Sequence, residues 1–89
     1  MSIIPGVYKD LAPKNRPDSP QGYDICMVHG VATHEANDDK RVIIERTHRN
    51  GSGPSIFQHL TISEFQEEIH VNDRKTARFV FIHANSYQD

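Results

Sequence analysis

Residues 23–46 constrain the fold most strongly, because two apolar arms flank a single charged turn. Apolar residues recur over 25–31 in the first arm, and the second arm holds the β-branched run Val42-Ile43-Ile44. Residues 35–40 between them are rich in Asn and Asp, which tolerate tight turns and accept hydrogen bonds from nearby amides. The pattern predicts a long β-hairpin over 23–46 that sets the register of the remaining sheet.

Shorter apolar segments predict further strands around this hairpin. Residues 55–60 and 76–83 alternate in the way that is typical of half-buried strands, and residues 67–71 predict another short strand. Near the start of the chain, residues 3–9 predict a short strand at the edge of a sheet. These strands are short and separated by turn-forming residues, as expected of an all-β domain.

Two connecting segments have distinct signals. Residues 61–65 predict a short helical turn, with Thr61 or Ser63 as its N-cap and Glu64 in the first turn. Residues 10–22 hold three prolines among polar residues, a composition that predicts an exposed surface loop.

The length of 89 residues predicts one domain over 1–89. A domain of this size buries only about two-thirds of the surface that its unfolded chain exposes, so we expect a thin core. We predict a mainly β fold: a small, strongly bent antiparallel sheet or an SH3-like barrel with one short helical turn.

Composition excludes several classes of protein. The net charge of −2 argues against nucleic acid as a partner, because such proteins normally carry a basic excess on one face. The single cysteine, Cys26, cannot form an internal disulfide, so we expect a reducing compartment and place the protein in the cytoplasm. We expect no membrane association, since there is no secretory signal and no apolar run of about 20 residues.

A series of short motifs runs along almost the whole chain. They are Pro5-Gly6-Val7-Tyr8, Tyr23-Asp24-Ile25, Gly30-Val31-Ala32-Thr33-His34-Glu35, Arg41-Val42-Ile43-Ile44, Phe65-Gln66-Glu67-Glu68-Ile69 and Ala77-Arg78-Phe79. In order and spacing this series resembles a small bacterial and phage family, domain of unknown function 1653. The resemblance implies a small β-rich domain and supplies no activity, cofactor or catalytic residue.

Two departures from the family pattern bear on function. The proline-rich segment 10–22 is longer than the corresponding link in the family. The Trp-x-Arg-Pro segment is replaced by Phe57-Gln58-His59-Leu60, which contains no arginine. Any ligand contact that the family makes through that arginine is therefore not carried over to this chain.

The chain has six histidines, an unusual number for its length, which raises the question of a metal site. Zinc needs three or four converging ligands, and strands can supply pairs at i, i+2 spacing. No His-x-His pair occurs, and Cys26 stands alone. We therefore predict no metal site and no cofactor, with the histidines on the surface or hydrogen-bonded.

The dipeptide His34-Glu35 lies where the first hairpin arm meets the turn. It could act as an acid/base pair if a nucleophile were near, but no serine, cysteine or lysine forms a recognisable motif with it. The alternative is that His34 hydrogen-bonds across the turn and fixes the hairpin.

Arginines and aromatic residues supply the candidate ligand site. Arg41, Arg46 and Arg78, with Tyr8, Phe57 and His59, could form one polar-aromatic patch, because guanidinium groups bind carboxylate or phosphate through two parallel hydrogen bonds. The alternative is that Arg41 and Arg46 pair with acidic neighbours such as Glu45 or Glu67 on a solvated face.

These observations favour a non-catalytic binding module that holds a small anionic ligand, a peptide or another protein on one face of the domain. The predicted ligand-binding residues are Tyr8, His34, Glu35, Arg41, Phe57, His59 and Arg78. One alternative is a small hydrolase or metal-dependent enzyme that uses His34 and Glu35. Another is an oligomeric interaction protein that associates through an exposed strand edge.

Overall fold

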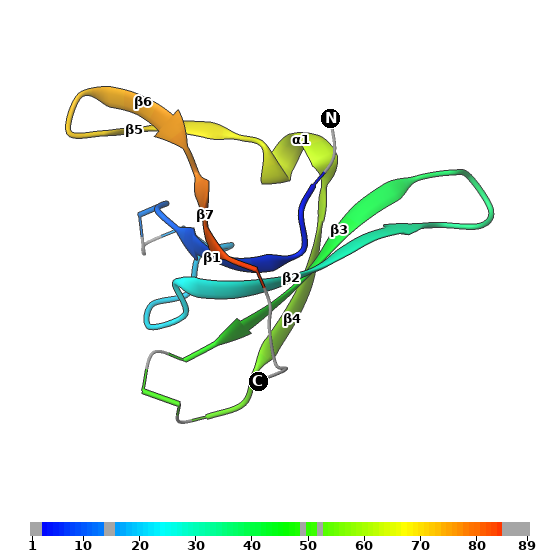
Figure 1. The fold of residues 1–89 in the computed structure, drawn as a ribbon, viewed down its shortest axis with the longest axis horizontal. Helices are drawn as coiled ribbons and strands as arrows, with labels where there is room; N and C mark the ends of the chain where they lie inside the picture. The colour runs from blue at the N-terminus through cyan, green and yellow to red at the C-terminus, as the bar shows by residue number, and fades with distance from the viewer. Residues whose placement is uncertain (1–2, 14–15, 49, 52, 85–89) are drawn as a thin grey trace.

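The structure is a computed structural model that describes residues 3–13, 16–48, 50–51 and 53–84. Within these residues the chain forms seven strands and one helical turn (Figure 1). In chain order they are β1 (Gly6–Asp10), β2 (Ile25–Thr33), β3 (Lys40–Thr47), β4 (Ile56–Thr61), α1 (Ile62–Phe65), β5 (Glu68–Val71), β6 (Arg74–Ala77) and β7 (Phe79–His83).

Five of the strands form one antiparallel sheet in the order β4-β3-β2-β1-β7, and β5 and β6 form a separate hairpin. The prediction of a mainly β fold with a bent antiparallel sheet and one short helical turn is confirmed. Among the described residues no ladder joins β4 to β7, so the sheet is open and the SH3-like barrel stays a prediction. The prediction that the first strand lies at an edge is wrong, because β7 returns to pair with β1.

The central hairpin is confirmed, with β2 and β3 paired from Ile25 opposite Thr47 to Thr33 opposite Lys40. At its tip the His34 amide donates to the Asp39 carbonyl at 2.7 Å. Asp38 adopts a φ of 55° there, a left-handed conformation that Asp tolerates better than most residues. The hairpins β2–β3 and β5–β6 project from opposite sides of the body (Figure 1).

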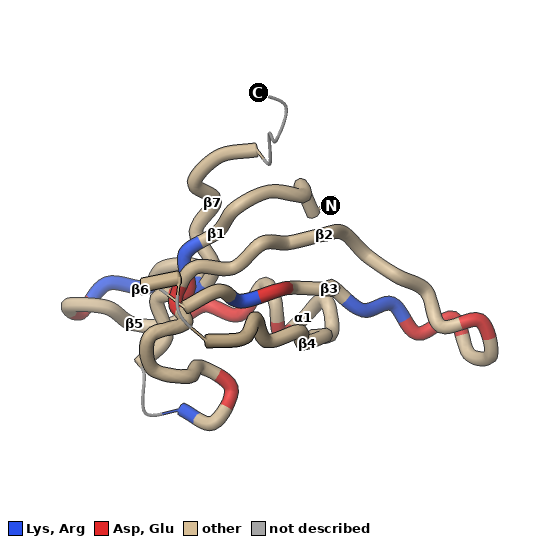
Figure 2. Tube along the Cα trace, turned by 90° about the horizontal axis from the view of Figure 1, so that it is seen from below, with Lys and Arg blue, Asp and Glu red and all other residues tan. Residues whose placement is uncertain are grey.

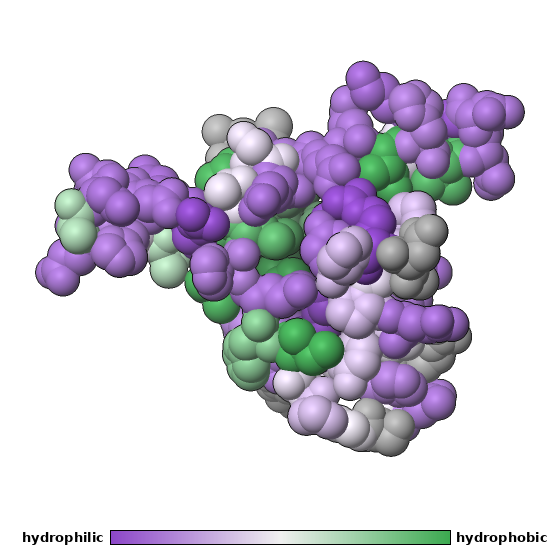
Figure 3. Space-filling view, turned by 180° about the vertical axis from the view of Figure 1, so that it is seen from behind, coloured by the Kyte–Doolittle hydropathy of each residue, from purple (hydrophilic) through white to green (hydrophobic). Residues whose placement is uncertain are grey.

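The core lies on the inner face of the bent sheet. Alternate residues point inward along β2 and β3, and Phe65 of α1 and Phe79 of β7 pack on them. The rings of Phe65 and Phe79 stack on each other, with 4.9 Å between their centroids. The buried hydrophobic cluster consists of Tyr8, Cys26, Val28, Val42, Ile44, Leu60, Phe65 and Phe79. Viewed from behind, hydrophobic residues gather near the centre and hydrophilic residues cover most of both projecting hairpins (Figure 3).

The predicted strand over residues 76–83 is interrupted at Arg78, which separates β6 from β7. The Arg78 amide donates to the Glu67 carbonyl at 2.9 Å, and its carbonyl accepts from the Leu11 amide at 2.8 Å. The chain therefore leaves the β5–β6 hairpin at Arg78 and joins the five-stranded sheet immediately after it.

The helical turn α1 is capped at its N-terminus by Thr61 and Glu64, two of the residues that the sequence indicated. The Thr61 hydroxyl accepts from the Glu64 amide at 3.0 Å, and the Glu64 carboxylate accepts from the Thr61 amide at 2.9 Å. This reciprocal capping box identifies Thr61 as the N-cap and excludes Ser63. The turn places Phe65 in the core, with Ile62 packed against it.

We expect Thr61→Ala to lower the free energy of unfolding by about 1 kcal/mol, because it removes the hydroxyl acceptor from the Glu64 amide. Ser63→Ala is the matched control, since Ser63 is exposed within the turn and should change stability by less than about 0.5 kcal/mol. Urea denaturation of the two variants measures the difference. Equal losses in both would contradict the assignment of the cap.

Candidate functional site

The structure divides the predicted ligand-binding residues between two places. Arg41, Phe57 and His59 lie on the outer face of the sheet, and His34 lies beside them at the end of β2. Tyr8 and Arg78 lie in the interior, at 7% and 1% relative exposure. The predicted polar-aromatic patch is therefore only partly brought together.

Strand alternation puts Arg41 on the outer face. Val42, Ile44 and Arg46 of β3 are buried, so the intervening residues point the other way. The β3–β4 register then sets three outward pairs side by side. They are Arg41 with Thr61, Ile43 with His59, and Glu45 with Phe57.

A shallow cleft of about 290 Å³ opens on this face. Its lining residues are Ala32, Thr33, His34, Arg41, Ile43 and His59. We call this site the outer cleft. It contains three of the predicted ligand-binding residues, and the Arg41 guanidinium is held there by a 2.8 Å contact from Nε to the Asp39 carboxylate.

Phe57 extends the same face beyond the outer cleft. It is 66% exposed, and its ring stacks on that of His29 with 6.1 Å between centroids. His29 is in turn 3.0 Å from the Glu45 carboxylate. Phe57 and His59 are two residues apart on β4 and point to the same face, so the exposed aromatic ring is the neighbour of His59 on that face.

The contacts of His34 lie within the hairpin turn. The His34 Nδ1 atom accepts a hydrogen bond from the Ala36 amide at 3.3 Å, and the His34 carbonyl accepts from the Asp38 amide at 2.9 Å. No hydrogen bond joins His34 to Glu35, which is exposed in the turn. These contacts match the alternative in which His34 fixes the hairpin turn.

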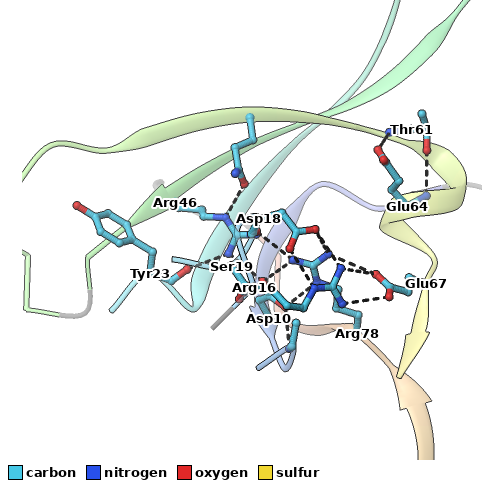
Figure 4. A network of polar contacts seen from close by, with 12 residues as sticks. Asp10, Arg16, Asp18, Ser19, Tyr23, Arg46, Thr61, Glu64, Glu67 and Arg78 are labelled. Atoms are coloured by element: carbon cyan, nitrogen blue, oxygen red, sulfur yellow. Dashed lines mark hydrogen bonds and ion pairs between the residues drawn. The ribbon is translucent and has the colours of Figure 1, made fainter. Parts of the chain in front are cut away.

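The interior holds a polar cluster that the sequence did not reveal, centred on Asp10 at the end of β1 (Figure 4). Its Oδ1 atom lies 2.9 Å from Arg78 Nε, and its Oδ2 atom lies 3.0 Å from both Arg78 Nη2 and Arg46 Nη1. The three side chains have at most 1% relative exposure. We call Asp10, Arg46 and Arg78 the buried ionic cluster.

The donors of both arginines are directed to acceptors inside the protein. Arg78 makes five hydrogen bonds, to Asp10, Asp18 and Glu67, which match the five N–H groups of a guanidinium. Arg46 donates to the Gln58 side chain at 2.6 Å and to the Tyr23 carbonyl at 3.0 Å. Arg78 therefore has no donor left for a ligand at the outer cleft.

The segment 10–22 is a loop, as predicted, since its described residues hold no helix or strand after β1. The prediction that it is simply exposed is wrong for Ala12 and Ser19, which are buried, while residues 14–15 lie outside the described part of the chain. The Asp18 carboxylate binds both Arg16 and Arg78 at 3.0 Å, and Arg16 reaches Glu67 at 3.1 Å. Ser19 is fully buried and donates to Asp10 at 3.2 Å. Among the described residues of this segment, Arg16, Asp18 and Ser19 tie it to the body of the protein through these contacts.

The electrostatics of the cluster favour ionised carboxylates. Burial raises the pKa of Asp10, but hydrogen bonds from Arg78, Ala12 and Arg46 outweigh it and lower the pKa to about 2. Hydrogen bonds from Arg16 lower the pKa of Glu67. Asp10 is therefore a carboxylate at neutral pH, and its charge is compensated by two guanidinium groups.

The parts of the chain that the structure describes hold no group of three or more His, Cys, Asp or Glu residues placed to bind a metal ion. They also hold no helix that is long and apolar enough to span a membrane.

Comparison of the chain with protein-family models, with curated proteins and with solved structures found no match. The resemblance to domain of unknown function 1653 is neither supported nor opposed by these comparisons, and it stays a prediction.

We expect Asp10→Asn to lower the free energy of unfolding by about 3–5 kcal/mol, because it leaves two buried guanidinium groups without their shared carboxylate. Asp18→Asn is the matched control. The Asp18 side chain is 40% exposed, so its loss should cost about 1 kcal/mol. Urea denaturation at neutral pH compares the two, and a loss in Asp10→Asn no greater than that in Asp18→Asn would contradict a central role for Asp10.

The stability of the wild-type protein should also fall in acid. The pKa of Asp10 is lowered from 3.8 to about 2, so its ionised form stabilises the fold above about pH 4 and this contribution disappears toward pH 2. The contribution is on the order of 2 kcal/mol. A protonated Asp10 resembles asparagine, so the stability gap between wild type and Asp10→Asn should narrow as pH falls. Unfolding measured over this range tests the prediction, and a constant gap would refute it.

Proposed function

We propose that the protein is a non-catalytic binding module that holds a small anionic ligand or an acidic peptide at the outer cleft. The observation that carries this proposal is that His34, which follows β2, lines one cleft with Arg41 of β3 and His59 of β4. The β2–β3 hairpin brings His34 near Arg41, and the β3–β4 register brings His59 to the same surface.

Arg41 is the principal anion-binding group in this proposal. Its Nε atom donates to Asp39, whereas its terminal nitrogens make no hydrogen bond within the described residues. A guanidinium held on one side by a carboxylate is oriented and still offers a pair of donors to a second carboxylate or phosphate. His59 and His34 can add hydrogen bonds to the ligand through their ring nitrogens.

Phe57 favours an extended ligand over a single small ion. Its exposed ring continues the face beyond His59 and offers apolar contact area to a peptide side chain or a nucleobase. Tyr8 and Arg78 have no part in this site, because both are buried and hydrogen-bonded in the interior.

Two further inferences accompany this proposal. The motif Gly30-Val31-Ala32-Thr33-His34, which carries the resemblance to domain of unknown function 1653, supplies Ala32 and His34 to the outer cleft. We therefore retain that family as a hypothesis. A cytoplasmic location is also retained, since a chain with a single cysteine cannot hold its fold together by an internal disulfide.

Equilibrium titration with nucleotides and with short acidic peptides, followed by the amide signals of residues 32–34, 41–43 and 57–59, tests the proposal. We expect Arg41→Gln to weaken binding of a hit from this panel by about tenfold or more, the effect of losing a charge-assisted hydrogen bond. Arg74→Gln is the matched control, because Arg74 is exposed on the β5–β6 hairpin.

Two results would contradict the proposal. One is the absence of any binder in the panel. The other is equal binding by the Arg41→Gln and Arg74→Gln variants, which would show that the Arg41 guanidinium does not contact the ligand.

A further inference from the structure

The strand β7 lies at the edge of the five-stranded sheet opposite to β4, and its exposed surface is apolar. Val80, Phe81 and Ile82 are 39%, 43% and 47% exposed. They make up half of the large hydrophobic residues that are exposed in the described part of the chain. Figure 2 shows β7 at one side of the molecule with no charged residue along it.

Exposed strand edges normally carry features that prevent pairing with other chains, such as lysine, proline or a very short length. None of the five residues of β7, Phe-Val-Phe-Ile-His, is a proline or carries a fixed charge. The register with β1 shifts between Val7 and Tyr8, which leaves Ile82 without a direct partner and makes Phe79–Phe81 the regular part of the strand. This regular part can extend the sheet by another strand.

We propose that β7 is a self-association edge, at which two copies of this chain pair through antiparallel β7 strands about a two-fold axis near Val80. In that arrangement Val80 lies opposite Val80 of the second copy, and Phe79 lies opposite Phe81. Each strand then meets an apolar residue at every regular position, and no like charges face one another. A second copy is favoured as the occupant because the strand is chemically symmetric about Val80 and therefore complementary to itself.

The edge is already ordered in the single chain. The Phe81 ring packs edge-on against the Tyr8 ring, with 5.3 Å between centroids. A Cβ atom at Gly6 would lie 2.8 Å from the Phe81 ring and 2.7 Å from the His83 carbonyl, so glycine permits this close approach of β1 and β7. Pairing therefore requires little ordering of β7, which lowers the entropic cost of association. The outer cleft involves β2, β3 and β4, so dimerisation through β7 leaves it accessible.

Sedimentation and light scattering of the whole chain, from micromolar to millimolar concentration, test this inference. We expect the mass to rise with concentration from one chain to two. Val80→Lys and Ile82→Lys should each keep the protein at the mass of one chain, because they place positive charges at the shared edge. Val31→Lys is the matched control, since Val31 is a valine of similar exposure, 44% against 39% for Val80, on β2 away from β7, and this variant should dimerise like wild type.

Circular dichroism establishes that each variant is folded, and the use of two β7 variants guards against failure of one to fold. A wild-type protein that stays at the mass of one chain throughout overturns the inference. So does a dimer that persists in both β7 variants, or one that is lost equally in Val31→Lys.

Discussion

The interaction on which the structure most depends is the contact of the Asp10 carboxylate with two buried guanidinium groups. Removing three charged groups from water is costly, and burial is tolerated only where charges are paired and donors and acceptors are satisfied. Arg46 and Arg78 meet that condition through Asp10 and through Asp18, Tyr23 and Gln58. The strands β1, β3, β4 and β7 already meet in the hydrophobic core, and the cluster adds the proline-rich loop to them through Asp18.

The buried ionic cluster also decides which residues remain available for function. Arg46 and Arg78 are committed to the interior, so the outer face keeps Arg41, His34, His59 and Phe57 as the groups that we propose to contact a ligand. The two faces follow from one alternation along β3, in which Val42, Ile44 and Arg46 point inward while Arg41, Ile43 and Glu45 point outward. The buried face of β3 therefore carries the core residues and Arg46 of the buried ionic cluster, and its other face carries polar side chains of the outer surface.

Local patterns predicted the local structure well. The hairpin over 23–46, the capping box at Thr61 and the mainly β class follow from turn residues and short-range periodicity. The pairing of strands far apart in the sequence was harder to predict. Nothing within residues 76–83 indicates that the chain passes from one sheet to the other at Arg78. The inward position of Arg46 did have a signal, since it continues the spacing of Val42 and Ile44. No sequence signal indicated the contacts of segment 10–22. Its proline content indicates that ladder hydrogen bonds are absent, but it says nothing of which residues the polar side chains contact.

The most direct test of this account is the titration of the Asp10 side chain followed by its carboxyl ¹³C chemical shift. If two guanidinium groups hold that carboxylate in the interior, its shift should stay at the ionised value through pH 3.8 and change only toward a midpoint of about 2. A midpoint at or above 3.8 would show that Asp10 is not held by the arginines, and the buried ionic cluster would then not be the centre of this fold.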